Sequence, residues 1–370
     1  MSKASVEIVV AGDLVLDEPD ADHWLSGIAP ALRAADLAIG HLEVPHTECG
    51  GEVPDDVPAP GAPPGNLRAI ARAGISMVSL AGNHIADCGA QGIADTIAGL
   101  DEAGVAHAGA GADIAEARRP AVSCVGAQRI ALLSYNCVGP EFGWAGPSRA
   151  GAAYLPLRTE NGEPVTPQSQ IVGIEPQVRD ILAADIAAAR ATADFVIVAM
   201  HKGRVHTPAL LESYERPLAH LAIELGADAV VAHHAHIARG IEFHLGKPVF
   251  HGLGNGCVVT RALSPSQNHP ARADWARKRQ ELFGFAPDEG YDLAPFHPEA
   301  KLSFLGRLTL LEGESPRTSI IPVFVEPPGR PVLAHGERAS EVRNYLERIT
   351  AVAGLPGIVV ESDGNVREAA

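Results

Sequence analysis

Short apolar runs alternate with alanine-rich segments of helical periodicity through the first two thirds of the chain. Apolar runs rich in β-branched residues are typical of buried strands, and runs of strong helix formers predict helices. The predicted strands cover residues 6–12, 35–43, 75–84, 194–203 and 228–236, with two more around a Gly-Ala turn within 121–136. The predicted helices cover residues 66–73, 91–103, 176–193 and 212–225. This alternation predicts an α/β fold in which helices cover mostly parallel sheets.

The last third of the chain has a stronger β pattern. The elements expected there are a hairpin over 240–255 with its turn at Gly246-Lys247, strands at 302–313 and 318–327, and a helix at 337–353. Loops rich in proline and glycine are expected at 44–66 and 137–175. We expect one domain, residues 1–370, with a core at 6–257, an irregular insert at 261–300, and C-terminal strands plus a helix at 301–370.

Charge and cysteine content exclude several classes of protein. A net charge of −16 argues against nucleic acid or an anionic membrane as a general partner, although a local cationic site could bind an anion. The five cysteines show no C-x-x-C pair, so a disulfide framework or a zinc knuckle is not expected, and a reducing compartment fits. No apolar run reaches the roughly 18 residues of a spanning helix, so we expect a cytoplasmic protein without a membrane segment. The oligomeric state stays open, including a homo-oligomer.

Nearly every predicted strand ends in polar residues that can bind a metal ion. They are Asp13, His41, Glu43, Asn83, His84, His201, His233, His234 and His236. Because the carboxyl ends of parallel strands share one edge of a sheet, we expect these side chains to converge there. Each residue alone has a simpler explanation, since Asp is common in turns and caps, and a single histidine is often partly buried and hydrogen-bonded.

The set as a whole favours a metal site. Buried polar groups without partners cost about 1–3 kcal/mol each, and a cation would remove that cost by becoming the partner. Carboxylates, imidazoles and an amide, without thiolate, suit Mn²⁺, Zn²⁺ or Fe. The number of ligands is sufficient for one or two divalent transition metals, two of which could share a carboxylate and activate a water.

Six sequence motifs carry a family resemblance. GDLVLD, GHLEVPHT, LAGNHIADCGAQGI, AHAGAGADIAEARRP, AMHKG and VVAHHAHIARGIEFHLGKPVFHGLGN occur in order over residues 6–257. They resemble the CapA proteins (poly-γ-glutamate capsule biosynthesis, PgsA-like), which are similar to calcineurin-like metallophosphoesterases. The resemblance implies a four-layer α/β/β/α sandwich.

The resemblance also implies roles for individual residues. Asp13 would bind the first metal, and Glu43 would take the place of the bridging carboxylate. Asn83 and His201 would bind the second metal, and the H-x-H of His234 and His236 would give one ligand to each. His84 would be the nearby acid or transition-state stabiliser.

Three departures from the family pattern affect these expectations. The phosphoesterases have D-x-H at the first site, whereas this chain has Val15 at the third position, and His41 could supply the missing ligand. CapA proteins usually have Trp where Lys202 stands, and G-H-H-P-H at residues 232–236. Lys202 and Arg204 would add positive charge beside the site, as expected for an anionic substrate. His233 is a further possible metal or substrate contact.

The leading functional hypothesis is a metal-dependent hydrolase in which an activated water attacks a phosphoester, an amide or a related bond of a small or oligomeric anionic substrate. His84 would donate a proton, and Asp87 would orient it, unless Asp87 caps the following helix. His206 could contact substrate or be a surface histidine.

Two alternatives remain. One is an accessory protein that binds poly-γ-glutamate without turnover. The other is a metal-assisted lyase acting on a small aromatic acid. The only hint of the lyase is a group of aromatic residues that could line a substrate cleft or pin the insert to the core: Trp275, Phe283, Phe285, Tyr291 and Phe296.

Overall fold

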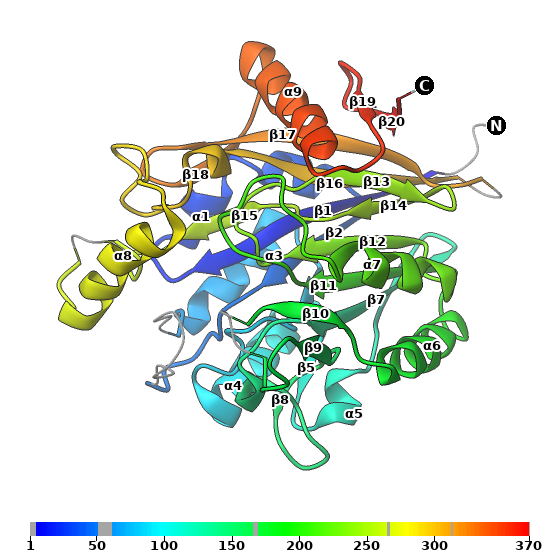
Figure 1. Ribbon diagram of the computed structural model, residues 1–370, viewed down its shortest axis with the longest axis horizontal. Coiled ribbons are helices and arrows are strands. Elements are labelled where there is room, and N and C mark those ends of the chain that lie inside the picture. Colours follow the sequence, from blue (N-terminus) through cyan, green and yellow to red (C-terminus); the bar gives the residue numbers. More distant parts are fainter. Residues whose placement is uncertain (1–4, 51–60, 166–168, 265–266, 312–313, 370) are drawn as a thin grey trace.

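The structure is a computed structural model that describes residues 5–50, 61–165, 169–264, 267–311 and 314–369. Two β-sheets form its centre (Figure 1). The first sheet has the order β18-β17-β16-β1-β2-β3-β4, with β15 also pairing with β1. Its strands are β1 (Ser5–Leu16), β2 (Leu37–Leu42), β3 (Met77–Ser79), β4 (Ala106–Ala108), β15 (Asn255–Val259), β16 (Leu302–Leu311), β17 (Arg317–Glu326) and β18 (Arg330–Leu333).

The second sheet has the order β13-β14-β12-β11-β7-β6. Its strands are β6 (Ala121–Val125), β7 (Gln128–Asn136), β11 (Phe195–His201), β12 (Ala229–His233), β13 (Ile241–His244) and β14 (Lys247–Phe250). Strands β7, β11, β12 and β14 run parallel, as do β1, β2, β3, β4 and β15 in the first sheet. Parallel strands of both sheets therefore present their carboxyl ends to a common region.

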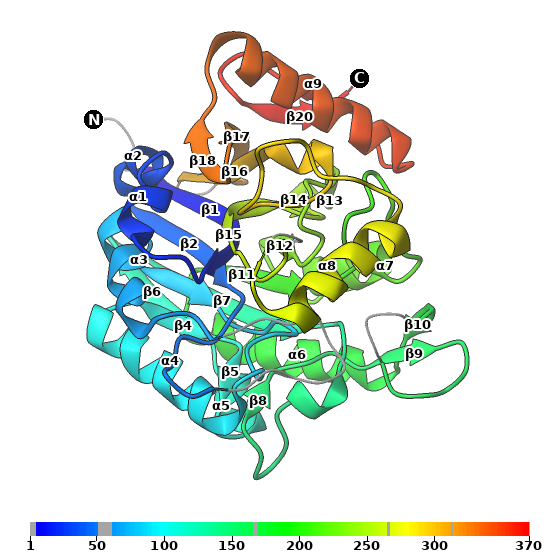
Figure 2. The same ribbon diagram turned by 90° about the vertical axis from the view of Figure 1, so that its left-hand side faces the viewer.

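Helices cover the outer faces of the two sheets (Figure 2). The first sheet is covered by α1 (Ala21–Leu25), α2 (Ala29–Ala34), α3 (Leu67–Ala73) and α4 (Gly89–Ala103), and the second by α6 (Gln177–Arg190) and α7 (Glu215–Glu224). The remaining helices are α5 (Ile114–Ala117), α8 (Pro270–Phe283) and α9 (Gly336–Val352). The layers run helix, sheet, sheet, helix, which confirms the predicted α/β/β/α sandwich.

The central strands are buried on both faces, and alternate side chains of each strand pack into different cores. In β1, Ile8 and Val10 belong to the core between the sheets, whereas Val9 and Ala11 pack against the helices of the first sheet. In β11, Ile197 likewise faces the inter-sheet core. Successive residues of a strand point to opposite faces, so a strand covered on both sides reads as a continuous apolar run.

Several local predictions differ from the structure. The hairpin β13–β14 turns at Leu245-Gly246, one residue before the predicted turn, because both residues have positive φ (51° and 73°), as a tight two-residue hairpin requires. The chain then leaves the hairpin, and β15 joins the first sheet instead of extending it. The insert 261–300 is not wholly irregular, because α8 begins with Pro270 and is followed by Gly284 in a left-handed conformation.

The loop predicted at 137–175 contains short strands. They are β8 (Gly151–Ala152), paired with β5 (Ala110–Gly111), and β9 (Leu157–Thr159), paired with β10 (Ile171–Ile174). Part of the loop predicted at 44–66 lies outside the described residues, and Pro64–Asn66 within it form a 3-10 turn. Two more 3-10 turns (Glu141–Gly143 and Pro298–Lys301) and the β19–β20 hairpin (Ile358–Val360, Val366–Glu368) complete the described elements.

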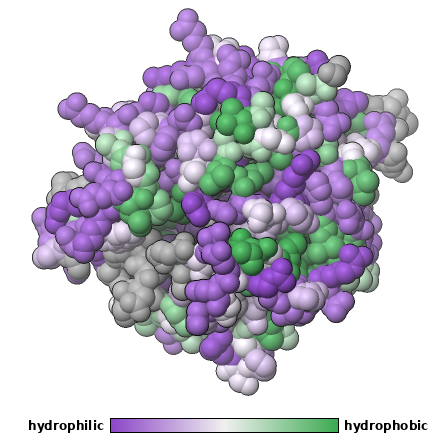
Figure 3. Space-filling view, in the orientation of Figure 1, coloured by the Kyte–Doolittle hydropathy of each residue, from purple (hydrophilic) through white to green (hydrophobic). Residues whose placement is uncertain are grey.

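The surface is mainly polar on the face shown in Figure 3, where hydrophilic side chains surround smaller apolar areas. This agrees with the chain's net charge of −16. Within the described ranges, no helix combines the length and the apolar character needed to cross a membrane.

Candidate metal centre

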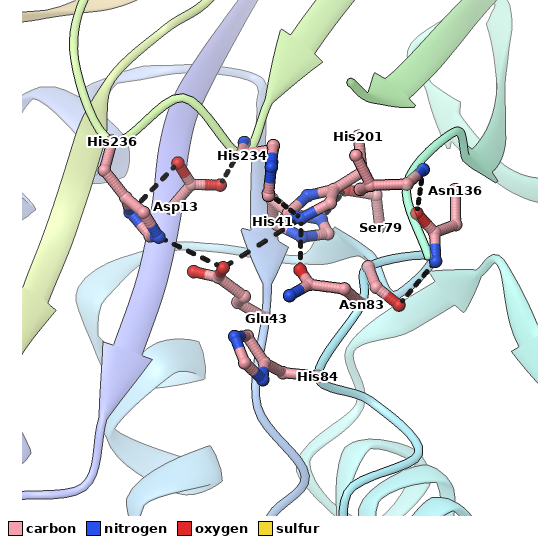
Figure 4. Close-up of polar contacts among 12 residues, drawn as sticks. Asp13, His41, Glu43, Ser79, Asn83, His84, Asn136, His201, His234 and His236 are labelled. Carbon is pink, nitrogen blue, oxygen red and sulfur yellow. Dashed lines mark hydrogen bonds and ion pairs between the residues drawn. The ribbon is translucent and has the colours of Figure 1, made fainter. Parts of the chain in front are cut away.

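The strand-end residues meet between the two sheets (Figure 4). In the first sheet Asp13 lies opposite His41, and in the second sheet His201 lies opposite His233. The predicted convergence therefore occurs, but at the junction of two sheets instead of along the edge of one. A register irregularity in β1 between Val10 and Asp13 accompanies this position.

Glu43 lies between two groups of potential ligand atoms. On one side, His236 Nε2 is 3.3 Å from Glu43 Oε1, and His236 Nδ1 is 3.7 Å from Asp13 Oδ2. On the other side, His201 Nε2 is 4.0 Å from Glu43 Oε1. The same His201 atom is 2.8 Å from Asn83 Oδ1 and 3.0 Å from His234 Nδ1. The two groups share one carboxylate, which is compatible with a binuclear metal site.

Several buried atoms of this cluster have no hydrogen-bond partner among the residues that the structure describes. They are Asp13 Oδ2, both carboxylate oxygens of Glu43, and His41 Nε2. Leaving such atoms unsatisfied costs about 1–3 kcal/mol each. A divalent cation would use these atoms as ligands, and the donor set of imidazole, carboxylate and amide suits a transition metal. The residues therefore fit the metal that the sequence predicts.

Burial and mutual charge shift the pKa values of the cluster. Burial, reinforced by Glu43, raises the pKa of Asp13 to about 8. Burial also raises the pKa of Glu43, but His236 and other histidines outweigh it and lower that pKa to about 2. Burial lowers the pKa of His41 to about 4 and that of His234 to about 3. Neutral imidazoles are the ligand form of histidine, so His41 and His234 are in the protonation state that binding requires.

His236 behaves differently from its neighbours. Burial lowers its pKa, but the carboxylates of Glu43 and Asp13 outweigh that effect and raise the pKa to about 9. Asn255 fixes the ring, because its Oδ1 lies 3.0 Å from His236 Nδ1. The site therefore attracts positive charge beside Asp13 and Glu43.

The H-x-H segment adopts a strained backbone. His234 and His236 have φ values of 88° and 52°, in the left-handed region. A non-glycine residue held there costs about 1–3 kcal/mol, and such residues concentrate at functional sites. The backbone amide of His234 also donates to Asp13 Oδ1 over 3.2 Å. This turn places both imidazoles at the cluster.

His41 and His233 occupy different positions. His41 Nδ1 lies 2.9 Å from Ser79 Oγ, which leaves Nε2 directed to the group that it forms with Asp13 and His201. Its location agrees with the expectation that it supplies an additional ligand. His233 instead stacks on His41 at 4.7 Å between ring centroids and belongs to none of the ligand groups found among the described residues.

His84 lies next to Glu43 (Figure 4), and it forms a buried pair with Asp87. Asp87 Oδ2 is 2.7 Å from His84 Nδ1. Helix α4 begins at Gly89 with Cys88 as its N-cap residue, so Asp87 is not the helix cap that sequence alone allowed. The geometry is that of a carboxylate orienting an imidazole.

Lys202 and Arg204 do not present free positive charge to the cluster. Lys202 is fully buried, and its Nζ donates to Glu215 Oε2 over 2.7 Å. Arg204 Nε lies 3.1 Å from Glu212 Oε1. The structure thus differs from the expectation, because each cation has a carboxylate partner that its sequence motif does not contain.

His206 is buried, with 6 % of its surface exposed, so it is not a surface histidine. Its ring lies 5.9 Å from that of His236.

Sequence reasoning missed Ser79 and Asn255, the partners of His41 and His236. Their position at the end of β3 and the start of β15 was the available signal.

Comparisons with known proteins identify relatives of this chain. A probable polyglutamine synthesis accessory protein of Mycobacterium tuberculosis is 32% identical over 242 residues, covering 63% of this chain and 59% of the relative. The PGA biosynthesis protein CapA of Bacillus subtilis is 24% identical over 261 residues, covering 69% and 63%. The chain thus spans about three fifths of the length of these relatives.

Among solved structures, calcineurin-like phosphoesterase YfkN from Bacillus subtilis is similar at a TM-score of 0.33 and 13% identity, covering 94% of this chain and 99% of that one. The sequence profile described as bacterial capsule synthesis protein PGA_cap matches residues 7–258. That match covers the H-x-H turn and the whole ligand cluster, and it confirms the predicted resemblance. The chain belongs to the PGA_cap family of bacterial capsule synthesis proteins.

Proposed function

We propose that this chain is a metal-dependent hydrolase that acts on an anionic substrate. The observation that carries the proposal is the position of Glu43 between two groups of ligand atoms, beside the His84–Asp87 pair. In this proposal Asp13, Glu43 and His236 hold one ion, with His41 as a further ligand. Glu43, Asn83, His201 and His234 hold the second.

A bound metal would lower the pKa of a water and polarise the bond to be cleaved. The chain's own residues would donate the proton to the leaving group and orient the metal ligands. Asp87 accepts a hydrogen bond from His84 Nδ1 and fixes the imidazole, so His84 can give the proton of its other nitrogen to the leaving group. Ser79 and Asn255 orient His41 and His236, as partners of metal-binding histidines do.

A second candidate function is a binding role without turnover. Relatives are named as a polyglutamine synthesis accessory protein and a PGA biosynthesis protein. The net charge of −16 and the carboxylate partners of Lys202 and Arg204 oppose binding of a long polyanion over the surface.

We also propose that the chain forms one domain, because β16 of the C-terminal part pairs with β1.

The test combines metal analysis with an activity screen. Purified protein should contain about one to two equivalents of Mn, Zn or Fe and should hydrolyse a member of a phosphoester, amide and ester library. The double variant His234→Ala/His236→Ala should lose both properties. His244→Ala is the matched control, because its imidazole pairs with Glu224 on the surface. Unchanged metal content in the double variant would refute the site, and metal without turnover on any substrate would favour the binding role.

A further inference from the structure

Arg279, on helix α8 of the insert, is a buried cation without a carboxylate partner. Its side chain is among the largest fully buried ones, with 2 % of the residue exposed. Nη2 donates to the carbonyl oxygen of Pro295, whereas Nε and Nη1 have no hydrogen-bond partner among the described residues. In the part of the chain that the structure describes, no Asp or Glu forms an ion pair with it.

This arrangement is unusual for a guanidinium. Burial lowers the pKa of Arg279 to about 10, so the group still carries its charge at neutral pH. A buried charge without a counter-ion is costly and is normally paired. Two other deeply buried cations have a carboxylate partner, since Glu215 lies 2.7 Å from Lys202 and 3.9 Å from Arg239. Arg279 therefore differs from Lys202 and Arg239, because no carboxylate of the described residues neutralises its charge.

The location of Arg279 connects it to the metal centre. Its guanidinium carbon lies 5.6 Å from the ring centroid of Phe285 and 5.4 Å from that of Phe296. The same two rings flank His206 at 5.1 Å and 5.6 Å. Phe296 also lies 5.0 Å from His236. One aromatic ring thus touches Arg279, His206 and a proposed metal ligand.

His206, which packs against Phe285 and Phe296, offers a second buried polar atom. Its Nδ1 is buried and has no hydrogen-bond partner within the described ranges of the chain. Its backbone has a φ of 55°, and its amide donates to Ala235 within the H-x-H turn. The imidazole is thereby held between the insert and the metal centre. Figure 2 shows α8 (yellow) lying outside the two sheets, as a separate wall.

We infer that Arg279 and His206 form a binding site for an oxyanion of the substrate, a carboxylate or a phosphate, against the aromatic wall of the insert. The guanidinium fork matches two oxygens of either group, and a neutral imidazole can donate or accept a third hydrogen bond. The wall of Phe285 and Phe296 would contact an apolar or aromatic portion of the same molecule. This inference rests on the proposed function, because the bound molecule is the one that the metal centre would cleave.

The competing explanation is that Arg279 only anchors the insert by stacking on phenylalanine. Arg338 is a matched control for it, because that guanidinium stacks on Phe324 at 4.4 Å but is half-exposed and paired with Glu326. Replacing Arg338 removes a stacked guanidinium without removing an unpaired one. An anchoring role predicts no effect of either substitution on anion binding.

The experiment measures calorimetric binding of benzoate and of inorganic phosphate to full-length protein, before and after treatment with EDTA. Wild type should bind one of the two anions, and the tighter one identifies the oxyanion. Arg279→Gln should weaken that binding at least about tenfold in both metal states, the effect of losing a charge-assisted pair. Arg338→Gln should leave it unchanged. Arg279→Lys keeps the charge without the fork, should give an intermediate affinity, and remains informative if Arg279→Gln fails to fold.

The outcomes separate the two proposals. Equal anion affinity in wild type, Arg279→Gln and Arg279→Lys, or no binding of either anion to wild type, would overturn the oxyanion site and leave the hydrolase proposal standing. Binding that depends on Arg279 in a protein that holds no metal and turns over no substrate would support the oxyanion site while refuting the hydrolase.

Discussion

Two buried polar clusters lie back to back in this protein, and consecutive residues lead into them. His201 belongs to the metal centre, and Lys202 belongs to a network behind it. In the network Lys202 Nζ donates to Glu215 and lies 3.3 Å from His251, whose other ring nitrogen is 2.8 Å from Glu242. The candidate metal centre instead retains oxygens of Asp13 and Glu43 that have no hydrogen-bond partner among the described residues.

The difference shows which property marks a candidate site. Both clusters are buried and rich in histidine and carboxylate, so burial and residue type do not distinguish them. The network closes on itself, because each charge has a partner of opposite sign. In the centre, His236 alone does not satisfy the carboxylate oxygens of Asp13 and Glu43 by hydrogen bonds, and an added cation would complete it. Breaking the network should therefore affect stability, and breaking the centre should affect chemistry.

The largest effect is expected at the proposed catalytic pair, His84 and Asp87. His84→Asn should lower kcat by roughly 10²–10⁴-fold, the usual contribution of general acid–base catalysis, with metal content near wild type. The loss should fall mainly in kcat, because the interaction belongs to the transition state. Asn83→Ala should instead deplete metal and activity together. The measurement pairs metal analysis with turnover, and a His84→Asn protein that loses its metal would make His84 a ligand.

The next effect concerns the network. Glu215→Gln should lower the free energy of unfolding by about 3–5 kcal/mol, because it leaves Lys202 buried without its carboxylate. Metal content per folded protein should not change. Arg239 loses its 3.9 Å pairing with Glu215 in both variants, but the double variant Lys202→Met/Glu215→Leu should be less destabilised than Glu215→Gln, since Lys202 no longer stays buried as an unpaired charge. Denaturant unfolding measures all three proteins, and a double variant that is less stable than the single one would contradict this account.

Chelation should have a comparable or smaller effect on stability. EDTA should lower the melting temperature, and Mn²⁺ or Zn²⁺ should restore it, because a ligand at about 1,000 times its Kd stabilises the folded state by about 4 kcal/mol. The His234→Ala/His236→Ala protein should not respond to EDTA. A wild-type melting curve that ignores chelation would make the centre an ordinary polar cleft.

The smallest effect is expected at a glycine beside the ligands. A Cβ on Gly82 would lie 3.0 Å from His41 Nε2 and 3.5 Å from His201 Cε1. Gly82→Ala should therefore displace the imidazoles of His41 and His201 and lower the free energy of unfolding by about 1–3 kcal/mol, as overpacking does. Gly65→Ala is the control, because nothing lies within 4 Å of its added carbon. Calorimetric titration with Mn²⁺ should show weaker binding only for Gly82→Ala.

Sequence reasoning succeeded where a local pattern dictates the structure. The apolar runs predict strands whose ends carry Asp13, Glu43 and His201, and the structure brings these side chains together, although β1 continues past Asp13 to Leu16. It failed for Lys202, because Glu215 comes from another element, and no local pattern records that pairing. The insert was also misjudged, because α8 has a weak amphipathic pattern and only its terminal Pro270 and Gly284 indicate a helix.

Strand β15 has a mechanical consequence. The chain leaves β14 in the second sheet and pairs with β1 in the first, where the Asp13 amide donates to Gly254 and Asn255 holds His236. A Cβ on Gly12 would lie 1.8 Å from the Gly254 oxygen, so the two segments are in close contact. The two sheets cannot separate unless the segment that joins them breaks its hydrogen bonds to β1. Amide hydrogen exchange at 255–259 should therefore occur only by cooperative opening of both sheets, so that the ligand geometry survives the local fraying of loops.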